Sequence, residues 1–418
     1  MMETKGSERM KWKWMMAMAL VVFFAAGCSG LQDKKPVDGQ PRVTENNDPE
    51  KNSGEPEKPA GQTEKPNDPN ETPAVQPGKT TDPQAKPNIP PEITHQAIKI
   101  HDASIVKDSP MIKIIYPQID GMKDQLAQAK INDFLKKKAD AADDSQMTNE
   151  DPSAPSSFDS TYKITFQNDH LISFVYDQYF YLSGAAHGMP SSVPILVDLD
   201  NGRIVESNEL FNGSPQIKPI ISGLVLKQDV LHTLEVMGEF KQISSDDLQQ
   251  IYLTKEGLMM FFPPYEYASF AEGTLLYHLS FFDIQSVINA AFFKSHGINI
   301  SKPIDSTIIY VSEGYHFSVP KEWMDRLVFE RTEYSENQKW LSEINVYLKT
   351  AYKPLLFSFR MYEKQKWTTL NPGAEVKLAE GNDIIFSYAI AQSPQNNLQA
   401  NDFINNVVPK IMESFQID

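Results

Sequence analysis

Few side chains in this sequence are of the kinds that do chemistry. The chain contains eight histidines and one cysteine, and His187 is distinctive because Gly184 and Gly188 flank it. An imidazole that titrates near neutral pH could act there as a general base, a ligand or a binding contact. No partner for acid–base work is evident beside it. We favour a structural role, in which the glycines take unusual backbone angles and the ring bonds a carbonyl, with binding second and catalysis last.

Aromatic side chains are the other candidates for recognition. Tyr179 and Tyr181 alternate with Phe180 along a predicted strand, so the two tyrosines share one face. Tyr265 and Tyr267 belong to a second cluster, together with Phe261, Phe262 and Phe270. Aromatic rings are favoured at interfaces and sugar-binding surfaces, although strand aromatics are more often core. The candidate binding residues are therefore His187, Tyr179, Tyr181, Tyr265 and Tyr267.

Motifs for enzymatic chemistry are absent from the sequence. It has no Gly-x-Ser-x-Gly elbow, no Walker loop, no Gly-x-Gly-x-x-Gly and no His-Glu-x-x-His. The histidines never come at helical ligand spacing, and a single cysteine leaves no disulfide. We predict no catalytic residue, no metal and no cofactor. Carboxylates brought together from distant parts of the chain remain an open alternative.

The charge balance argues against nucleic acid as a partner. The net charge is −16, and the acidic residues are interspersed with Lys and Arg. Binding of phosphate needs a basic stripe with aromatic platforms on the same face. The sequence contains neither, so we predict no nucleic-acid binding.

The cysteine ends an N-terminal targeting segment. Lys5 and Arg9 belong to a basic start, residues 15–26 are apolar, and Cys28 follows small residues, which is the layout of a signal peptide. The apolar run of about 12 residues is shorter than the roughly 20 that a membrane span needs. Residues 20–28 resemble a bacterial lipobox. The resemblance implies transfer of a diacylglyceryl group, with acyl chains such as palmitate, to the Cys28 thiol, and then cleavage before it. A free cysteine near an uncleaved or differently cleaved signal is the alternative.

A Pro-rich tether follows Cys28 and extends to residue 92. It is dominated by Pro, Glu, Lys, Asp, Asn, Thr and Gly and has no aromatic residue. Such a segment cannot bury enough apolar surface to fold, and Pro-rich chains extend with a rise of about 3.1 Å per residue. We predict a spacer through a cell envelope. A Pro-rich ligand for another module is the alternative.

The remaining sequence alternates strand patterns with a few helical ones. Helical spacing occurs at residues 121–142 and 401–415. Strands are predicted at residues 98–106, 111–119, 162–167, 171–182, 193–198, 308–311, 327–331, 343–349, 355–362 and 384–391. These elements predict an α+β fold with antiparallel sheets packed against helices.

Short strings between residues 179 and 268 occur in a recognisable order. They are Tyr-Phe-Tyr-Leu-Ser-Gly-Ala-Ala-His-Gly from Tyr179, Val-Asp-Leu-Asp-Asn-Gly-Arg from Val197, Asn-Glu-Leu-Phe from Asn208, Tyr-Leu-Thr-Lys-Glu-Gly-Leu from Tyr252 and Phe-Phe-Pro-Pro-Tyr-Glu-Tyr-Ala from Phe261. Over roughly residues 95–297, this set resembles a paired extracytoplasmic domain. That domain occurs in a lysozyme-responsive anti-sigma factor of Gram-positive bacteria, and ahead of the catalytic domain of a peptidoglycan deacetylase.

The resemblance implies an α+β domain that binds a lysozyme-like protein or lies beside cell-wall chemistry. It carries over no catalytic residue, because the chain has no His-x-x-x-His string, which the deacetylase's metal-dependent domain needs beside its Asp-Asp string. The predicted lipid anchor also replaces the membrane span and cytoplasmic part of the anti-sigma factor, so we do not expect sigma-factor inhibition.

The last part of the chain carries a second, shorter resemblance. The string Gly-Tyr-His-Phe-Ser-Val-Pro-Lys-Glu-Trp from Gly314 is similar to the opening of small α+β domains of the photosystem-associated and nuclear-import-factor type. It implies a binding or scaffolding fold.

The predicted organisation begins with a signal peptide at residues 1–27 and a lipidated tether at residues 28–92. A paired α+β domain follows, with one region at residues 93–190 and another at residues 191–303, and a separate small α+β domain occupies residues 304–418. We expect a lipoprotein anchored to the outer face of the cell membrane of a Gram-positive envelope, which recognises a muramidase-like protein or a cell-wall glycan. The alternatives are a peptidoglycan hydrolase that uses His187 with carboxylates, and a structural envelope component.

Overall fold

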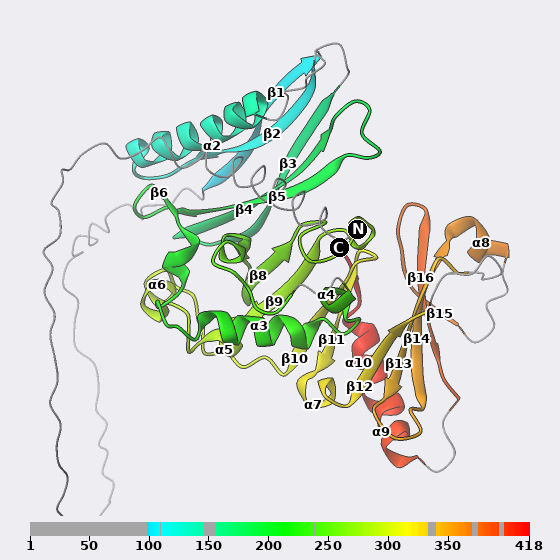
Figure 1. Ribbon diagram of the computed structural model, residues 1–418. Helices are drawn as coiled ribbons and strands as arrows, with labels where there is room; N and C mark the ends of the chain where they lie inside the picture. The colour runs from blue at the N-terminus through cyan, green and yellow to red at the C-terminus, as the bar shows by residue number, and fades with distance from the viewer. Residues whose placement is uncertain are drawn as a thin grey trace, which may run out of the picture. The chain divides into compact units, whose positions relative to one another are not determined.

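The computed structural model describes residues 98–108, 110–145, 156–236, 240–332, 340–369, 375–392 and 397–418. The predicted signal peptide, Cys28 and the Pro-rich tether lie outside these residues. The described residues belong to one unit of the chain. This unit is the predicted α+β fold, built from sheets with few helices (Figure 1). Within the ranges above, no helix is long and apolar enough to cross a membrane.

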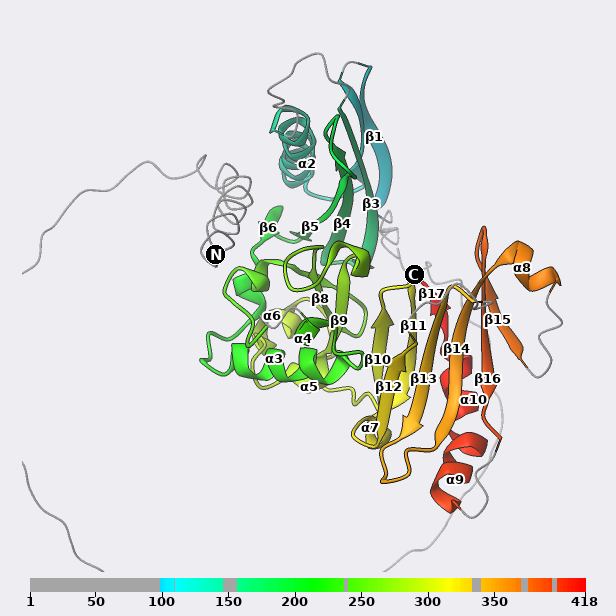
Figure 2. The ribbon, with the colours of Figure 1, turned by 45° about the vertical axis from the view of Figure 1, so that its right-hand side comes forward.

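A six-stranded sheet forms the first part of the fold. Its strands lie in sequence order and are β1 (Lys99–Asp108), β2 (Met111–Asp120), β3 (Ser157–Gln167), β4 (Leu171–Tyr181), β5 (Met189–Asp198) and β6 (Arg203–Val205). Neighbours are antiparallel except β2 and β3, which run parallel because the helix α2 (Gln125–Ser145) returns the chain between them. Figure 2 shows α2 along one face of the sheet, where Ile131 and Leu135 share a core with Phe174.

The start of α2 corrects the predicted helix at residues 121–142. Asp124 accepts hydrogen bonds from the backbone N–H groups of Leu126 and Ala127 at 2.9 and 3.0 Å. A capping carboxylate of this kind satisfies donors that lack a partner in the first helical turn. Met122 is buried although it lies outside the helix, so its apolar side chain extends the helical pattern beyond the helix itself.

The second part of the fold is a small sheet covered by short helices. Its sheet has the order β7 (Ile251–Leu253), β8 (Gly257–Phe262) and β9 (Leu275–Ser280). Every residue of β8 is buried. The surrounding elements are η1 (Ser207–Leu210), α3 (Ile217–Gln228), α4 (Thr233–Val236), η2 (Asp247–Gln249), η3 (Phe270–Glu272), α5 (Phe281–Ile284) and α6 (Ala290–Ser295). The core includes Leu171 and Leu196 of the first sheet, so the first two parts share packing.

The third part begins near Ser306 and contains two sheets. One has the order β10 (Ser306–Val311), β11 (Tyr315–Pro320) and β17 (Gln416–Ile417); the other has the order β12 (Leu327–Arg331), β13 (Ser342–Leu348), β14 (Leu355–Glu363), β16 (Ile384–Ile390) and β15 (Val376–Glu380). Its helices are α7 (Lys321–Met324), α8 (Lys364–Thr369), α9 (Leu398–Asn406) and α10 (Val408–Glu413). Phe403 of α9 packs with Phe357 and Val346 in one core.

The predicted C-terminal helix at residues 401–415 is wrong as a single element. The structure has α9 and α10, which meet at Val407. Pro409 lies in the first turn of α10, where proline is tolerated because that turn needs no N–H partner, whereas inside a longer helix it would remove a hydrogen bond. The proline therefore explains the break that the apolar spacing alone does not reveal.

Candidate binding surface

His187 lies in the connection between β4 and β5, next to the turn in which the backbone N–H of Ala185 donates to the carbonyl of Leu182. Its Nδ1 lies 3.0 Å from the carbonyl oxygen of Gly188, and its Nε2 lies 3.1 Å from Oη of Tyr265. A carbonyl only accepts, so in the neutral ring Nδ1 carries the proton and Nε2 accepts from the tyrosine hydroxyl. This arrangement joins the first sheet to the loop after β8.

Three rings stack around this contact. The centroids of His187 and Phe270 lie 3.8 Å apart with an interplanar angle of 25°. The ring of Tyr265 is 5.6 Å from Phe270 and 6.1 Å from His187. Such spacings suit attractive aromatic pairs, each contributing about 0.5–1.5 kcal/mol beyond the burial of area. The stack is therefore held together without help from a ligand.

Tyr265 combines exposure with a strained backbone. Its φ angle is +69°, a region in which a bulky residue is rarely found, and its side chain is 44% exposed. The backbone N–H of Tyr265 donates to the carbonyl of Ala268 at 3.0 Å and holds the loop in place. Strained residues of this kind cluster at ligand-binding sites, where the surrounding structure maintains them.

Tyr179 extends the exposed aromatic surface from β4. Its side chain is 45% exposed, and its hydroxyl accepts a hydrogen bond of 3.2 Å from the backbone N–H of Gly188. A Cβ on Gly188 would lie 2.4 Å from the Tyr179 ring, so only glycine allows this approach. We call Tyr179, His187, Tyr265 and Phe270 the His187 patch.

The other two predicted binding residues lie differently. Tyr181 is half-buried at the end of β4. Tyr267 packs edge-to-face against Phe262 at 4.8 Å, and its hydroxyl donates to the buried carboxylate of Asp247 at 2.9 Å. Burial raises the pKa of the Tyr267 hydroxyl well above its usual value. The predicted cluster around Tyr265 and Tyr267 is thus divided between a surface and a core.

The contacts of His187 are with a backbone carbonyl, a tyrosine hydroxyl and two aromatic rings. In the part of the chain that the structure describes, the ring nitrogens of His187 form hydrogen bonds with a backbone carbonyl and a tyrosine hydroxyl. A general base of the His type relies on a carboxylate or similar group to orient the ring. The patch instead presents two exposed tyrosines beside a rigid ring stack.

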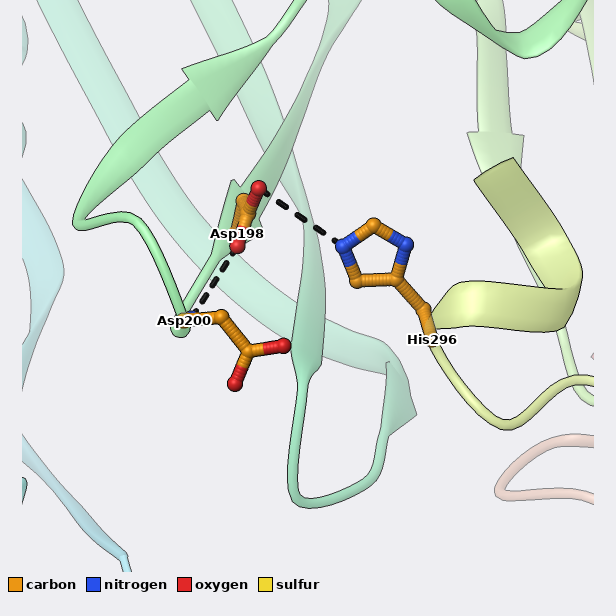
Figure 3. Close-up of side chains that lie close together, drawn as sticks. All are labelled: Asp198, Asp200 and His296. Carbon is orange, nitrogen blue, oxygen red and sulfur yellow. Dashed lines mark hydrogen bonds and ion pairs between the residues drawn. The ribbon is translucent and has the colours of Figure 1, made fainter. Parts of the chain in front are cut away.

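A separate polar cluster, which the sequence patterns did not predict, lies where β5 ends. Asp198 is fully buried, and its Oδ1 accepts from the backbone N–H groups of Asp200 and Asn201 at 3.0 and 3.1 Å. His296, just after α6, directs Nε2 toward Oδ2 of Asp198 at 3.6 Å (Figure 3). The only sequence signal was the Asp-Leu-Asp-Asn-Gly turn, which gave no indication of its distant histidine.

Two family models match parts of the chain. A family described as Deacetylase PdaC matches residues 105–190, and a family described as Protein of unknown function (DUF3298) matches residues 208–281. Tyr179 and His187 fall in the first match, whereas Tyr265 and Phe270 fall in the second. The His187 patch therefore joins the two matched regions, while Asp198 and His296 lie outside both.

Solved structures of the second family resemble the chain weakly. A DUF3298 family member from Bacteroides fragilis is 12% identical, with 48% of this chain and 98% of that chain covered and a TM-score of 0.34. A DUF3298 family protein from Pseudomonas aeruginosa is 10% identical, with 47% and 96% covered and a TM-score of 0.36. No curated protein sequence matches the chain.

Proposed function

We propose that the chain is an extracytoplasmic lipoprotein, anchored through acyl chains on Cys28, whose His187 patch binds a cell-wall glycan. The observation that carries the proposal is the pair of exposed tyrosines, Tyr179 and Tyr265, fixed beside a stack of two further rings. Aromatic faces of this kind provide large, rigid contact area at low entropic cost, with a hydroxyl for hydrogen bonding.

The groups of the patch also suit a glycan, which offers hydroxyls and apolar ring faces. The contacts of the patch include aromatic rings, hydroxyls and backbone groups. The match to a family described as a deacetylase, together with the resemblance to a domain ahead of a peptidoglycan deacetylase, supports a setting beside the cell wall. The signal-peptide layout and the long Pro-rich tether support a position outside the membrane.

Binding to purified peptidoglycan and to a soluble N-acetylglucosamine oligosaccharide tests the glycan proposal. The protein would be residues 29–418 without lipid, measured by co-sedimentation and calorimetry. We expect Tyr265→Asn to weaken binding about tenfold, because the lost contact of about 1.4 kcal/mol corresponds to that factor. Asparagine tolerates the positive φ angle, so the fold should survive.

The matched control is Tyr352→Ala, since Tyr352 is 95% exposed and belongs to the third part of the fold. It should bind as the unmodified chain does. A lysozyme arm separates the protein alternative. The chain could bind lysozyme and neither glycan, with the lysozyme binding lost in Tyr265→Asn. That outcome would replace the glycan proposal with a protein partner. Equal glycan binding by both variants would refute the role of the patch.

The lipid anchor needs its own test. Cells expressing the full chain would be labelled with an alkyne analogue of palmitate and fractionated. We expect label and membrane association for the unmodified chain and for Ser29→Ala, and loss of both for Cys28→Ala. Membrane association that persists without Cys28 would show that the apolar segment itself holds the protein.

A further inference from the structure

The polar cluster at the end of β5 contains the buried carboxylate of Asp198, which faces the buried ring of His296. Asp198 has no exposed surface. Its Oδ2 accepts from Nδ2 of Asn201 at 2.7 Å and lies 3.5 Å from Nε of Arg203. The same oxygen faces Nε2 of His296 at 3.6 Å. Burying a carboxylate is costly unless it is paired or coordinates a metal.

The tautomer of His296 makes this contact electron-rich on both sides. Its Nδ1 lies 2.7 Å from the carbonyl oxygen of Phe292 and must therefore carry a proton. In the neutral imidazole, Nε2 then has a lone pair, which faces Oδ2 of Asp198 at 3.6 Å. His296 is only 7% exposed, so bulk water does not separate the two atoms. A proton on Nε2 or a cation between the two atoms would relieve the repulsion of the two lone pairs.

Asp200 completes a set of three donors and opens it to solvent. One ligand atom from each of Asp198, Asp200 and His296 lies within 4.8 Å of the others. The side chain of Asp200 is 48% exposed, and its Oδ2 lies 2.8 Å from Nδ1 of His170. Such a contact from a neighbouring group orients a ligating side chain. The exposed carboxylate also provides the path by which an ion enters.

The local charges leave room for a dication. Arg203 lies 3.5 Å from Oδ2 of Asp198, but its guanidinium forms a bidentate pair with Glu209 at 2.8 Å. That pair is neutral as a unit. The carboxylates of Asp198 and Asp200 then keep two negative charges, which a divalent cation would balance.

We propose that Asp198, Asp200 and His296 bind a Zn²⁺-type transition-metal ion and leave a fourth position open to solvent. Mixed imidazole and carboxylate donors favour Zn²⁺ over Ca²⁺ or Mg²⁺, which prefer oxygen alone. Zinc bonds of about 2.0–2.2 Å require donors closer together than 4.8 Å. The turn that carries Asp200 moves inward on binding, and the ion ties the β5–β6 connection to the end of α6.

The experiment uses untagged protein comprising residues 29–418, stripped with a chelator. Calorimetry with ZnCl₂, MnCl₂ and CaCl₂ measures affinity, and elemental analysis after dialysis measures stoichiometry. We expect one tightly bound zinc per chain, with calcium at least tenfold weaker. Asp200→Asn should weaken zinc binding at least tenfold and leave the circular dichroism spectrum unchanged, because this side chain is exposed.

The matched control is Asp246→Asn, an exposed turn carboxylate that should leave zinc binding unaltered. Imidazole ¹⁵N spectra of the stripped and zinc-loaded protein give a second readout, since metal on Nε2 shifts that nitrogen of His296. Absence of saturable zinc binding would overturn the proposal. So would zinc binding that Asp200→Asn leaves unchanged, or a His296 ring that is protonated on both nitrogens with zinc present.

Discussion

His278 makes the stability of the second part of the fold depend on pH. Burial of its ring on β9, aided by the charge of Lys321, lowers the pKa to about 4, although Glu256 and Asp283 oppose the shift. An unfolded histidine titrates near 6.5. Between these pH values the unfolded chain binds more protons than the folded chain. The stability that the neutral ring of His278 contributes is therefore fully present above about pH 6.5 and is lost as the pH falls toward 4.

The size of the effect follows from the two pKa values. Between pH 7 and pH 5 the free energy of unfolding should fall by at most about 2 kcal/mol through this residue, since one pKa unit corresponds to about 1.4 kcal/mol. The value is an upper figure because the ring is only partly buried. His278→Gln cannot titrate and should remove this part of the pH dependence.

Urea denaturation at pH 7, 6 and 5 measures the difference. The unmodified chain should lose more stability on acidification than His278→Gln does, by up to about 2 kcal/mol. Leu398→Ala is the control, because the side chain of Leu398 is 86% exposed and carries no titratable group, and its pH profile should follow that of the unmodified chain. Parallel pH profiles for the unmodified chain and His278→Gln would refute the assignment of a depressed pKa to this residue.

The remaining predictions concern packing and buried charge, each measured by urea denaturation. Gly257→Ala should destabilise by about 2 kcal/mol or more, because its Cβ would lie 2.2 Å from the backbone oxygen of Leu279; Gly223→Ala, in open space on α3, should instead stabilise by about 0.5–1 kcal/mol. Arg331→Met should cost about 3 kcal/mol, since Glu272 and Glu313 would lose their partner in a half-buried network. Tyr267→Phe should cost about 1–3 kcal/mol, because Asp247 would lose a donor while remaining buried. A change below about 0.5 kcal/mol in any of the three destabilising variants would contradict its stated cause.

Local sequence patterns predicted much of the strand structure, because successive side chains of a strand point alternately into the core and toward solvent. The predicted strand at residues 327–331 matches β12, and alternation along β13 places Ile344, Val346 and Leu348 in the core. Strand β8 escaped prediction because every one of its residues is buried, which removes the alternation. The start of α2 and the break between α9 and α10 were not predicted, because Asp124 and Pro409 act through backbone hydrogen bonds. The spacing of apolar residues carries no information about those bonds.

The residues of the His187 patch were predictable by type and only partly by position. Tyr179, His187 and Tyr265 were foreseen as binding candidates, and the contact between His187 and Tyr265 spans 78 residues of sequence. Nothing in the local pattern distinguishes Tyr265 from Tyr267. Both tyrosines lie in the turn after β8, where Tyr265 has a positive φ angle. The ring of Tyr265 reaches the surface, whereas the hydroxyl of Tyr267 donates to the buried Asp247.

The polar cluster shows why histidine spacing is a weak guide to metal sites outside single helices. Asp198 and Asp200 belong to a turn, where Asp side chains often form hydrogen bonds with nearby backbone N–H groups. That role accounts for both hydrogen bonds that Oδ1 of Asp198 accepts. It does not explain why a buried imidazole, with its proton committed to Phe292, faces the other oxygen. Nδ2 of Asn168, in the turn between β3 and β4, donates to the carbonyl of His296 at 2.9 Å and helps to hold the histidine near the end of β5. The proposed cation site therefore depends on the tertiary fold, and the zinc titration tests it independently of glycan binding.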